Sequence, residues 1–524
     1  MSKSDKKIFE IDVLKEKLCE QEQLVRKQAL RIAALEEQLQ LSRHKRFGAS
    51  SEKADADQLN LFNEAEAATD TSPDEEAADT TTIPEHKRKK RGRRAIDENL
   101  PRVIIEHDIP EAEKTCACGK HKTRIGEETS EQLDIIPPKV QVLRHVRYKY
   151  ACRSCEGTED DGPTVVIAPM PPQPIPKSNA SPGLLAYIVI AKFLDGLPLY
   201  RLTKIFARIG FDLGRGTMAN WMIRMGELIV PLINLMNEAQ LDYDVLQMDE
   251  TSVQVLKEPG KAATSKSYMW IRRGGPPGKR VILFDYDRSR SGAVPLRLLG
   301  DYNGILQTDG YDGYAAVVLA GDLTHVGCLA HARRKFDEAV KAQAKKKTGR
   351  GGLAKQGLAL IQRIYAVERE ARKRELDPAQ RKQLRDEKAK PLWDELRRWL
   401  DKSIGQVPPQ TLTGKALRYL DRQFLQIKRY LDDGRIEVDN NLCENAIRPF
   451  VMGRKAWLFS DTPAGADASA RLYSLIETAK ANDVEPYAYL LHVFTELPKA
   501  KTAEDIEALL PWNVTLPATH SVAA

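Results

Sequence analysis

The chain has 524 residues, of which 42% are hydrophobic and 30% charged, and its formal net charge is +7. This length allows two to four domains, and the composition is typical of a soluble globular protein in which the distribution of charge matters more than its total. The most apolar stretch, residues 183–194, contains Lys192 and is too short to cross a membrane, and the N-terminus has no apolar signal segment, so we expect neither a membrane protein nor a secreted one.

An apolar heptad repeat runs through residues 8–42. No glycine or proline interrupts it, which is typical of a parallel leucine-zipper coiled coil. The repeat predicts a homo-oligomer, in which two glutamines of the d series weaken the association or fix its register; the alternative is one amphipathic helix that packs on its own protein. The a series is Ile11, Leu18, Val25, Ile32 and Leu39, and the d series is Leu14, Gln21, Gln28 and Leu35.

Residues 43–102 are expected to form a linker that is first acidic and then basic. The acidic part, residues 64–84, is rich in Ala and Thr and has no periodicity, which indicates a segment without a packed core. Residues 87–94 then carry seven positive charges in eight positions, including Lys89, Arg91 and Arg93. Such a run can neutralise several phosphates and enter a narrow minor groove, so we expect it to contact nucleic acid. The alternative is a solvated tail that interacts with the acidic segment.

Two pairs of cysteines in the region 103–167 predict a zinc-finger module. Closely spaced pairs in an intracellular chain with few cysteines more often bind metal than form disulfides, although free thiols and two disulfides are the alternatives. The Zn²⁺ would be structural, because a closed tetrahedral site leaves no open position. Strands are expected at residues 103–105, 132–136, 140–143 and 146–150. The expected ligands are Cys116, Cys118, Cys152 and Cys155, with His121 and His145 as substitutes.

A proline-rich connector at residues 170–176 leads into a helical region at 177–240. One helix is expected at 184–194, a second begins near Pro198, and a third begins at Gly216 after a turn that contains glycine. This order is that of a helix-turn-helix. Thr217, Asn220 and Arg224 would share the exposed face of the recognition helix and meet base edges or phosphates. The alternative is an ordinary helical hairpin.

The region 241–340 changes to a strand pattern. Three runs at 245–256, 268–272 and 281–286 precede a helix at 294–299, strands at 305–308 and 323–327, and a helix at 332–340. This order indicates the mixed sheet of an RNase H-like α/β catalytic core. Residues 341–430 read as a helical insertion, 431–466 as the second part of the core, and 467–510 as a C-terminal helical segment. We therefore expect a multidomain α+β protein.

Three acids are notable in this core: Asp249 in the first strand, Asp309 just after the fourth, and Glu444 in a later helix. An acid in a strand that faces a core is costly unless it is paired or binds metal. Neighbouring strands would bring Asp249 and Asp309 to one edge of the sheet. With Glu444 they could hold two divalent ions for in-line attack on a phosphodiester.

Each of these acids also has a structural explanation. Asp249 could be a satisfied half-buried acid, with Glu250 on the opposite face of its strand. Asp309 could shape an Asp-Gly turn, and Glu444 could complete a helix capping box with Asn441. Strand order, spacing and the basic residues after Glu444 together favour metal binding. The competing acids are Asp285, Asp287, Asp312, Glu437, Asp439 and Glu477.

Basic residues follow Glu444. Arg448 lies one helical turn after it, on the same face, and could clamp a phosphate. Arg454 and Lys455 are further candidates for phosphate contacts. Pro449 is expected to shorten or kink the helix, which leaves the positions of these two side chains open.

His331 and Arg333 belong to another basic motif, residues 328–336. His331 begins a helix just after a strand, near the sheet edge where the acids are expected. It could contact the scissile phosphate or a flanking base, and Arg333 is a further candidate DNA contact. The alternative for His331 is a structural hydrogen bond at the helix start.

These motifs together resemble the DDE transposases of bacterial insertion sequences, most closely the IS66 family. The resemblance covers most of the chain, from the zipper and the four-cysteine finger to a C-terminal stretch at 473–480. One departure is Ala456, where the family usually has Asn after Arg-Lys; the three acids are intact. The other matching segments are residues 44–48, 248–251, 308–311, 328–336, 440–449 and 453–459.

The resemblance implies DNA cleavage followed by strand transfer, in which water and then a 3′-hydroxyl attacks phosphorus. Two Mg²⁺ ions, or Mn²⁺, suit such all-oxygen ligands and phosphate partners. The zipper would pair protomers so that two transposon ends are synapsed, and the finger and helix-turn-helix would bind those ends. Accessory proteins of the same element are also implied, as is a bacterial cytoplasmic, nucleoid-associated location.

Two rival functions are compatible with parts of the sequence. A nuclease of the same fold would cut DNA without joining ends, but the zipper, finger and basic arm argue against it. A DNA-binding regulator descended from a transposase would need no metal chemistry, but the intact acid triad argues against that alternative.

Overall fold

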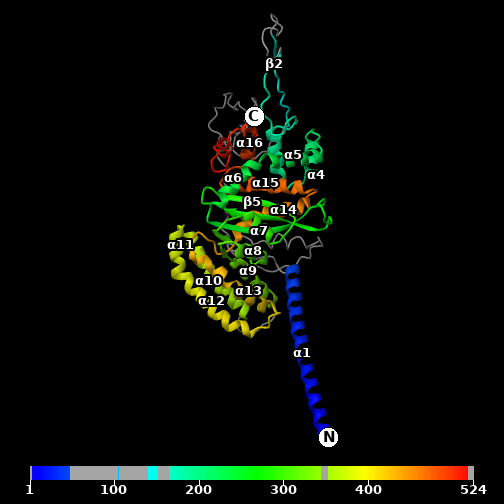
Figure 1. Cartoon of the computed structure of the whole chain (residues 1–524), viewed down its shortest axis with the longest axis vertical. Helices are drawn as coiled ribbons and strands as arrows, with labels where there is room; N and C mark the ends of the chain where they lie inside the picture. The colour runs from blue at the N-terminus through cyan, green and yellow to red at the C-terminus, as the bar shows by residue number, and fades with distance from the viewer. Residues whose placement is uncertain (1–2, 48–103, 105–139, 152–164, 344–351, 517–524) are drawn as a thin grey trace, which may run out of the picture. The chain divides into compact units, whose positions relative to one another are not determined.

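The computed structural model describes residues 3–47, 104, 140–151, 165–343 and 352–516. In these ranges the protein is a mixed α/β structure rich in helix, with a five-stranded sheet (Figure 1). None of the helices described is both long and apolar enough to cross a membrane. The predictions that lie outside the described residues concern Lys89, Arg91, Arg93, Cys116, Cys118, Cys152, Cys155, His121 and the strand at 132–136.

The five-stranded sheet has the order β5-β4-β3-β6-β7. Its first three strands form an antiparallel meander, and β6 and β7 run parallel to β3. A glycine- and proline-rich turn joins β4 to β5, where Gly275 and Gly278 have positive φ values of 90° and 79° that glycine adopts without strain. The strands are β3 Val245–Gln254, β4 Lys266–Gly274, β5 Val281–Asp287, β6 Ile305–Gln307 and β7 Thr324–Val326.

Helices cover both faces of this sheet. Leu246, Met248 and Trp270 point to one face and pack with α7 (Ala293–Leu299) and α8 (Ala315–Ala320). The other face is covered by α14 (Asn441–Trp457) and α15 (Pro463–Ala481), as Figure 1 shows. Successive residues of a strand point to opposite faces, so Asp249 lies on the α14 side and Glu250 on the α8 side, as the sequence predicted.

A group of helices precedes the sheet. The helices predicted at 184–194, from near Pro198 and from Gly216 are confirmed. Gly210, with a φ of 80°, lies in the turn between the second and the third. Thr217, Asn220 and Arg224 share the exposed face of the third helix. Its opposite face packs closely on α15. The four helices are α3 Pro182–Phe193, α4 Leu199–Arg208, α5 Arg215–Leu228 and α6 Val230–Leu241.

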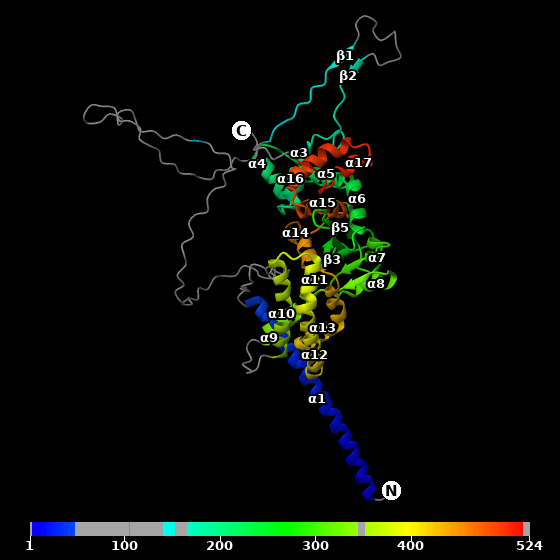
Figure 2. The same ribbon diagram turned by 90° about the vertical axis from the view of Figure 1, so that its left-hand side faces the viewer.

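The helices between β7 and α14 pack around a hydrophobic core of their own (Figure 2). Trp393, Phe336 and Phe424 are buried in this core. The guanidinium of Arg385, fully buried in a π-helical turn, bonds the carboxylate of Glu368. The helices are α9 Leu329–Gln343, α10 Leu353–Lys373, α11 Pro378–Leu384, α12 Lys390–Ser403 and α13 Leu412–Lys428, with the π-turn at Arg385–Ala389.

Three predictions of secondary structure need correction. Residues 140–143 form no strand; their apolar side chains are exposed, and an extended segment without a paired neighbour has no ladder to hold it. Of the run 146–150 only its end is a strand, β1 (Lys149–Ala151), which pairs with β2 (Val165–Ile167). Pro449 does not shorten α14, which continues for 17 residues. Helix α8 was not predicted, because its six apolar residues read equally well as a loop or a strand.

The N-terminal segment is one helix, α1 (Lys3–Phe47). The described heptad residues Val25, Ile32, Leu35 and Leu39 are more than half exposed on this single chain. The carboxylate of Glu37, on another side of the helix, accepts a hydrogen bond of 2.9 Å from the backbone N–H of Leu412. The chain ends in α16 (Pro486–Glu496) and α17 (Ala503–Glu507).

Candidate active site

The three predicted acids come from neighbouring elements. Strands β3 and β6 are parallel, and Gln247 and Gln307 lie opposite each other in their register. Asp249, within β3, and Asp309, just after β6, each follow that pair by two residues, so they lie at the same level along the two strands. Glu444 lies in the first turn of α14, which packs against β3. The topology therefore gathers the three acids at one edge of the sheet.

The acids interact electrostatically. Burial, and then the charges of Glu444, Glu250 and Asp309, raise the pKa of Asp249 well above its usual value. Burial also raises the pKa of Asp309, and it raises that of Glu444 to about 7 against the opposing charge of Arg334. Such carboxyl groups are neutral when protonated, and they ionise more readily when a cation lies beside them.

The carboxylate of Glu444 is 5% exposed and incompletely satisfied. Its Oε2 lies 3.6 Å from Nη2 of Arg334, and its Oε1 lies 3.7 Å from Nδ1 of His331, which is too far for a hydrogen bond. Neither Oε1 of Glu444 nor Nδ1 of His331 has a hydrogen-bond partner in the part of the chain that the structure describes. Burial, with the charges of Arg334 and Lys335, lowers the pKa of His331 to about 3, so its ring is neutral at pH 7.

One group of metal-ligating atoms is tightly clustered among the described residues. Atoms of Cys328, His331 and Glu444 all lie within 4.8 Å of one another. Asp249 and Asp309 are not members of that group. Among the described residues, the three predicted acids therefore do not form such a group by themselves, whereas Glu444 forms one with His331 and Cys328.

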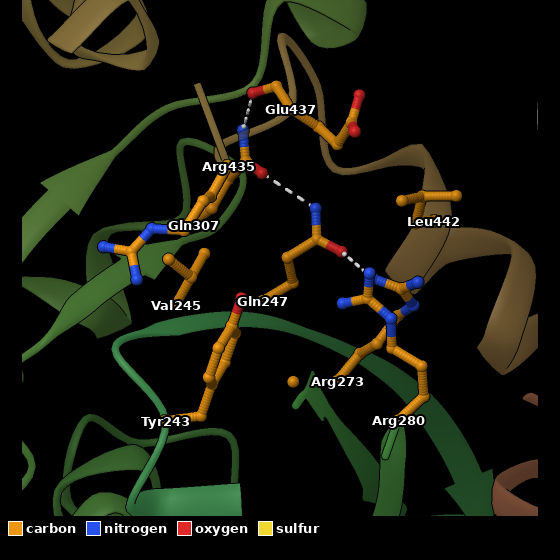
Figure 3. Close-up of a pocket in the computed structure, with 10 residues that line it drawn as sticks. Tyr243, Val245, Gln247, Arg273, Arg280, Gln307, Arg435, Glu437 and Leu442 are labelled. Atoms are coloured by element: carbon orange, nitrogen blue, oxygen red, sulfur yellow. Dashed lines mark hydrogen bonds between the residues drawn. The ribbon is translucent and has the colours of Figure 1, made fainter. Parts of the chain in front are cut away.

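A buried glutamine pair ties together the segments that carry the acids. Gln247 donates from Nε2 to Oε1 of Gln307 at 2.8 Å, and Gln307 donates to the backbone oxygen of Glu437 at 2.8 Å. Gln247 also accepts from Nη1 of Arg273 at 3.3 Å. Figure 3 shows this chain of bonds beside a pocket that Tyr243 also lines. The residues that immediately precede α14 are thus fixed to β3 and β6.

The structure also supports some of the alternative explanations of these acids, in which they have a purely structural role. Oδ1 of Asp309 accepts from the backbone N–H of Tyr311 at 2.9 Å, so this residue does shape a turn. Oδ1 of Asp249 accepts from its neighbour's N–H at 2.9 Å. The capping box predicted for Asn441 and Glu444 is wrong: the N-cap is Asn440, whose side chain makes no capping bond and instead donates to the backbone oxygen of Met248.

The other predicted DNA contacts are dispersed. Nη1 of Arg454 donates to Oγ1 of Thr251 at 3.1 Å, so it braces α14 on β3 close to Asp249. Arg448, Lys455 and Arg333 are half-buried. The exposed group Thr217, Asn220 and Arg224 is on α5, whose other face packs on α15.

The competing acids have partners of their own. The carboxylate of Asp285 bonds Arg272, that of Asp287 bonds Arg297, and that of Glu477 bonds Lys480. Glu437 bonds Arg381 and Arg372. Burial would raise the pKa of Glu437, but the two positive charges outweigh burial and lower this pKa to about 2. Asp439 accepts from the hydroxyl of Tyr365 at 2.9 Å. Asp312 is exposed in a short 3-10 turn.

Four residues near the acids were missed as site candidates. Arg334, rather than Arg333, approaches Glu444, and Cys328 lies beside it. Gln247 and Gln307 had a signal in the sequence: each is a buried amide two positions before an acid in an apolar strand. Such a pair is costly unless the amides bond each other, which predicts adjacent strands.

Comparison with known proteins identifies the chain. The family model described as "Transposase IS66 family" matches residues 177–468, more than half of the 524 residues. The chain belongs to the IS66 transposase family. Three further models of this family match other regions: its C-terminal element at 474–512, its zinc-finger binding domain at 113–156, and "Transposase C of IS166 homeodomain" at 34–105. The prediction of a transposase with a zinc finger and a zipper-like N-terminal region is confirmed at the level of the family.

Several relatives of this IS66 transposase come from Sinorhizobium fredii strain NBRC 101917 / NGR234. The uncharacterized protein y4qI is 33% identical over 441 residues, which cover 82% of this chain and 78% of the relative. The uncharacterized protein y4jD is 32% identical, over 81% and 83%. The uncharacterized protein y4hP is 28% identical, over 92% and 89%. The similarity therefore extends well beyond the sheet.

Proposed function

We propose that this IS66 transposase binds the ends of an insertion sequence and catalyses DNA cleavage and strand transfer with Asp249, Asp309 and Glu444. The observation that carries the proposal is the gathering of three buried, mutually repelling carboxylates from β3, the end of β6 and α14. The strand order β5-β4-β3-β6-β7 supports an RNase H-like core, since the two aspartates lie at one level on adjacent parallel strands, Asp249 within β3 and Asp309 just after β6.

The residues present fit divalent cations. Oε1 of Glu444 is buried without a hydrogen-bond partner, and burial raises the pKa values of all three acids. Such atoms in a native structure need a partner, and a cation is one. Two bound Mg²⁺ or Mn²⁺ ions would supply activation of the nucleophile and stabilisation of the leaving oxygen.

The surrounding residues of the chain hold this arrangement in place. Arg334 lies near Oε2 of Glu444, which orients the carboxylate. Arg290 bonds Glu250 on the other face of β3 and keeps that acid away from the reacting groups. Arg454 joins α14 to β3. Charged neighbours therefore orient Glu444 and hold α14 and β3, the elements that carry Glu444 and Asp249, in place.

The remaining parts of the chain would bind DNA and assemble the complex. We propose that Thr217, Asn220 and Arg224 contact the transposon ends, together with the basic arm and a structural zinc held by the four finger cysteines. Arg333, Arg448 and Lys455 would approach phosphates near the acids, and His331 lies beside Glu444 at the same site. The exposed heptad face of α1 would pair protomers, and accessory proteins of the element would join them.

The decisive experiment is a strand-transfer assay with purified protein, Mg²⁺, a labelled transposon-end duplex and a plasmid target. We expect joined product from the wild type and none from Asp249→Asn, which keeps the shape but removes the charge. Asp312→Asn is the matched control, because Asp312 is exposed three residues after Asp309 and has no role in the proposal.

Each other outcome points to a different function. Cleavage without joining by the wild type, lost in Asp249→Asn, favours a nuclease. Binding of end DNA without any metal-dependent product favours a regulator. Equal loss in Asp249→Asn and Asp312→Asn would show that the effect is not specific to the proposed triad.

A further inference from the structure

Cys328 belongs to the clustered group Cys328, His331 and Glu444, and its thiol has no role in the proposed two-metal chemistry. Its thiol is buried at the start of α9, and its Sγ accepts a hydrogen bond of 3.2 Å from the backbone N–H of Asn440. A backbone hydrogen bond from His331 acts on the same sulfur. Burial and the charges of Glu444 and Asp439 raise the pKa of the Cys328 thiol well above its usual value, against these two N–H donors, so it is a thiol until a metal ion replaces its proton.

His331 and Glu444 offer two more ligand atoms to the same point. Nδ1 of His331 and Oε1 of Glu444 are both buried and both lack hydrogen-bond partners, although the two atoms are 3.7 Å apart. That spacing is too long for a hydrogen bond and suits two ligands of one ion with bonds of about 2 Å. Arg334 lies nearest the other oxygen of Glu444, so it leaves Oε1 available.

We propose that Cys328, His331 and Glu444 form a transition-metal site, selective for Zn²⁺-like ions over Mg²⁺, next to Asp249 and Asp309. Sulfur, imidazole nitrogen and one carboxylate oxygen are the ligands of Zn²⁺ and Co²⁺, whereas Mg²⁺ takes oxygen ligands. Three protein ligands leave one position open, as in zinc sites that bind water or substrate. Binding of the ion releases the thiol proton of Cys328 to solvent as the sulfur–metal bond forms.

This inference rests on the proposed function only in that Glu444 serves both, and it is tested without DNA. Full-length protein stripped of metal is titrated with Co²⁺, and bound Co²⁺ and the thiolate-to-cobalt absorption are measured. We expect the wild type to bind one more equivalent than Cys328→Ser or His331→Ala, while the zinc finger contributes equally to all. Excess Mg²⁺ should not displace this equivalent, and Zn²⁺ should.

Two variants serve as controls. Cys443→Ser removes another buried free thiol, one residue before Glu444 and outside the cluster, and should retain the extra equivalent. Asp249→Asn should retain it too. Equal stoichiometry and spectra in the wild type and Cys328→Ser would overturn the proposal, as would loss of the ion in Asp249→Asn. If the extra ion is present but the wild type yields no DNA product, the proposed function fails and the metal site stands.

Discussion

At the scale of single residues, the charge of Asp249 opposes folding while it serves the proposed site. Burial and nearby acids raise its folded-state pKa well above the unfolded value, so the folded protein binds the proton more tightly. Stability is therefore lost as the pH rises from the unfolded pKa, near 4, through the raised folded pKa. This loss is what a bound cation would reverse.

The first prediction follows from this loss of stability with rising pH. In magnesium-free buffer at pH 8, Asp249→Asn should raise the free energy of unfolding by about 1–2 kcal/mol, because it removes a buried like charge. The gain should shrink as the pH is lowered toward 5. Urea denaturation at the two pH values measures it, with Asp312→Asn as the exposed control. A variant less stable than the wild type at pH 8 would contradict the conclusion that repulsion between Asp249 and the neighbouring acids destabilises the folded protein.

Gln307 gives a second prediction, about positioning. Gln307→Leu removes the bonds to Gln247 and to the backbone of Glu437, which should cost about 1–3 kcal/mol. It should also lower the strand-transfer rate at saturating DNA at least tenfold, with little change in affinity for the end duplex. The control is Gln254→Leu, an exposed amide of β3 whose bond to Ala263 leads away from the acids. A loss of DNA affinity equal to the loss of rate would indicate a general folding defect instead.

The residue scale also shows what the sequence could predict. The places of Asp249 and Asp309 followed from strand order and spacing. The neighbours of Glu444 did not, because helix α9 brings Cys328 and His331 to it from more than a hundred residues away. Local patterns cannot give such a pairing. The capping box failed for a related reason, since Asn440 bonds β3 in place of its own helix.

At the scale of elements, a buried charge network joins the helical insertion to the segment before α14. Arg385 donates to both oxygens of Glu368 at 2.9 Å and to backbone oxygens of Tyr430, Asp433 and Ile436 at 2.8–2.9 Å. This one guanidinium therefore holds the turn that leads from α13 toward Glu444. The insertion thus supports the position of the third acid.

The third prediction tests that link. Arg385→Met should lower the free energy of unfolding by about 3–5 kcal/mol, because it leaves Glu368 buried with only Arg381 as its partner. The double variant Glu368→Gln/Arg385→Met should be more stable than the single one, since the unpaired charge is gone. Urea denaturation of the three proteins checks this order. A single variant as stable as the double would show that the network contributes no charge-specific stability.

Two glycines of α5 make a fourth, internally matched prediction. A Cβ on Gly226 would lie 2.7 Å from Cα of Ala468, whereas a Cβ on Gly216 meets nothing within 4 Å. Gly226→Ala should therefore cost about 1–3 kcal/mol through overpacking against α15, and Gly216→Ala should be neutral or stabilise by up to about 1 kcal/mol. Thermal unfolding of both variants measures the difference. Equal effects would mean that α5 does not need this close approach.

Among the elements, the long amphipathic ones were predictable and the short ones were not. Helices such as α10 and α13 show an apolar face, and β3 to β5 are bounded by glycine and proline. The segment 140–143 alternates like a strand, yet in the structure it pairs with nothing that is described. A strand depends on a partner elsewhere in the chain, which is why alternation alone misled.

At the scale of the whole molecule, α1 is the element through which we propose that protomers associate. Two faces of this helix have different surroundings. Glu37 bonds the start of α13 in the same chain, while Val25, Ile32, Leu35 and Leu39 remain exposed. The side that carries Glu37 thus contacts its own protein, whereas the apolar heptad side, which the alternative interpretation would pack on the same chain, is exposed and available to a second copy. Burying four such side chains against a partner stabilises association, by roughly 1.5–3 kcal/mol for each one fully buried.

The fifth prediction concerns that heptad face. Ile32→Lys places a charge in the a series and should convert the full-length oligomer to a monomer, measured as molar mass by light scattering. Ala33→Lys adds the same charge at the next, outward-facing position and should leave the mass unchanged. Synapsis of two labelled end duplexes should fail in Ile32→Lys while binding of a single end persists, because α5 and the sheet are untouched. A monomeric wild type would instead assign α1 to packing on its own chain through the side that carries Glu37.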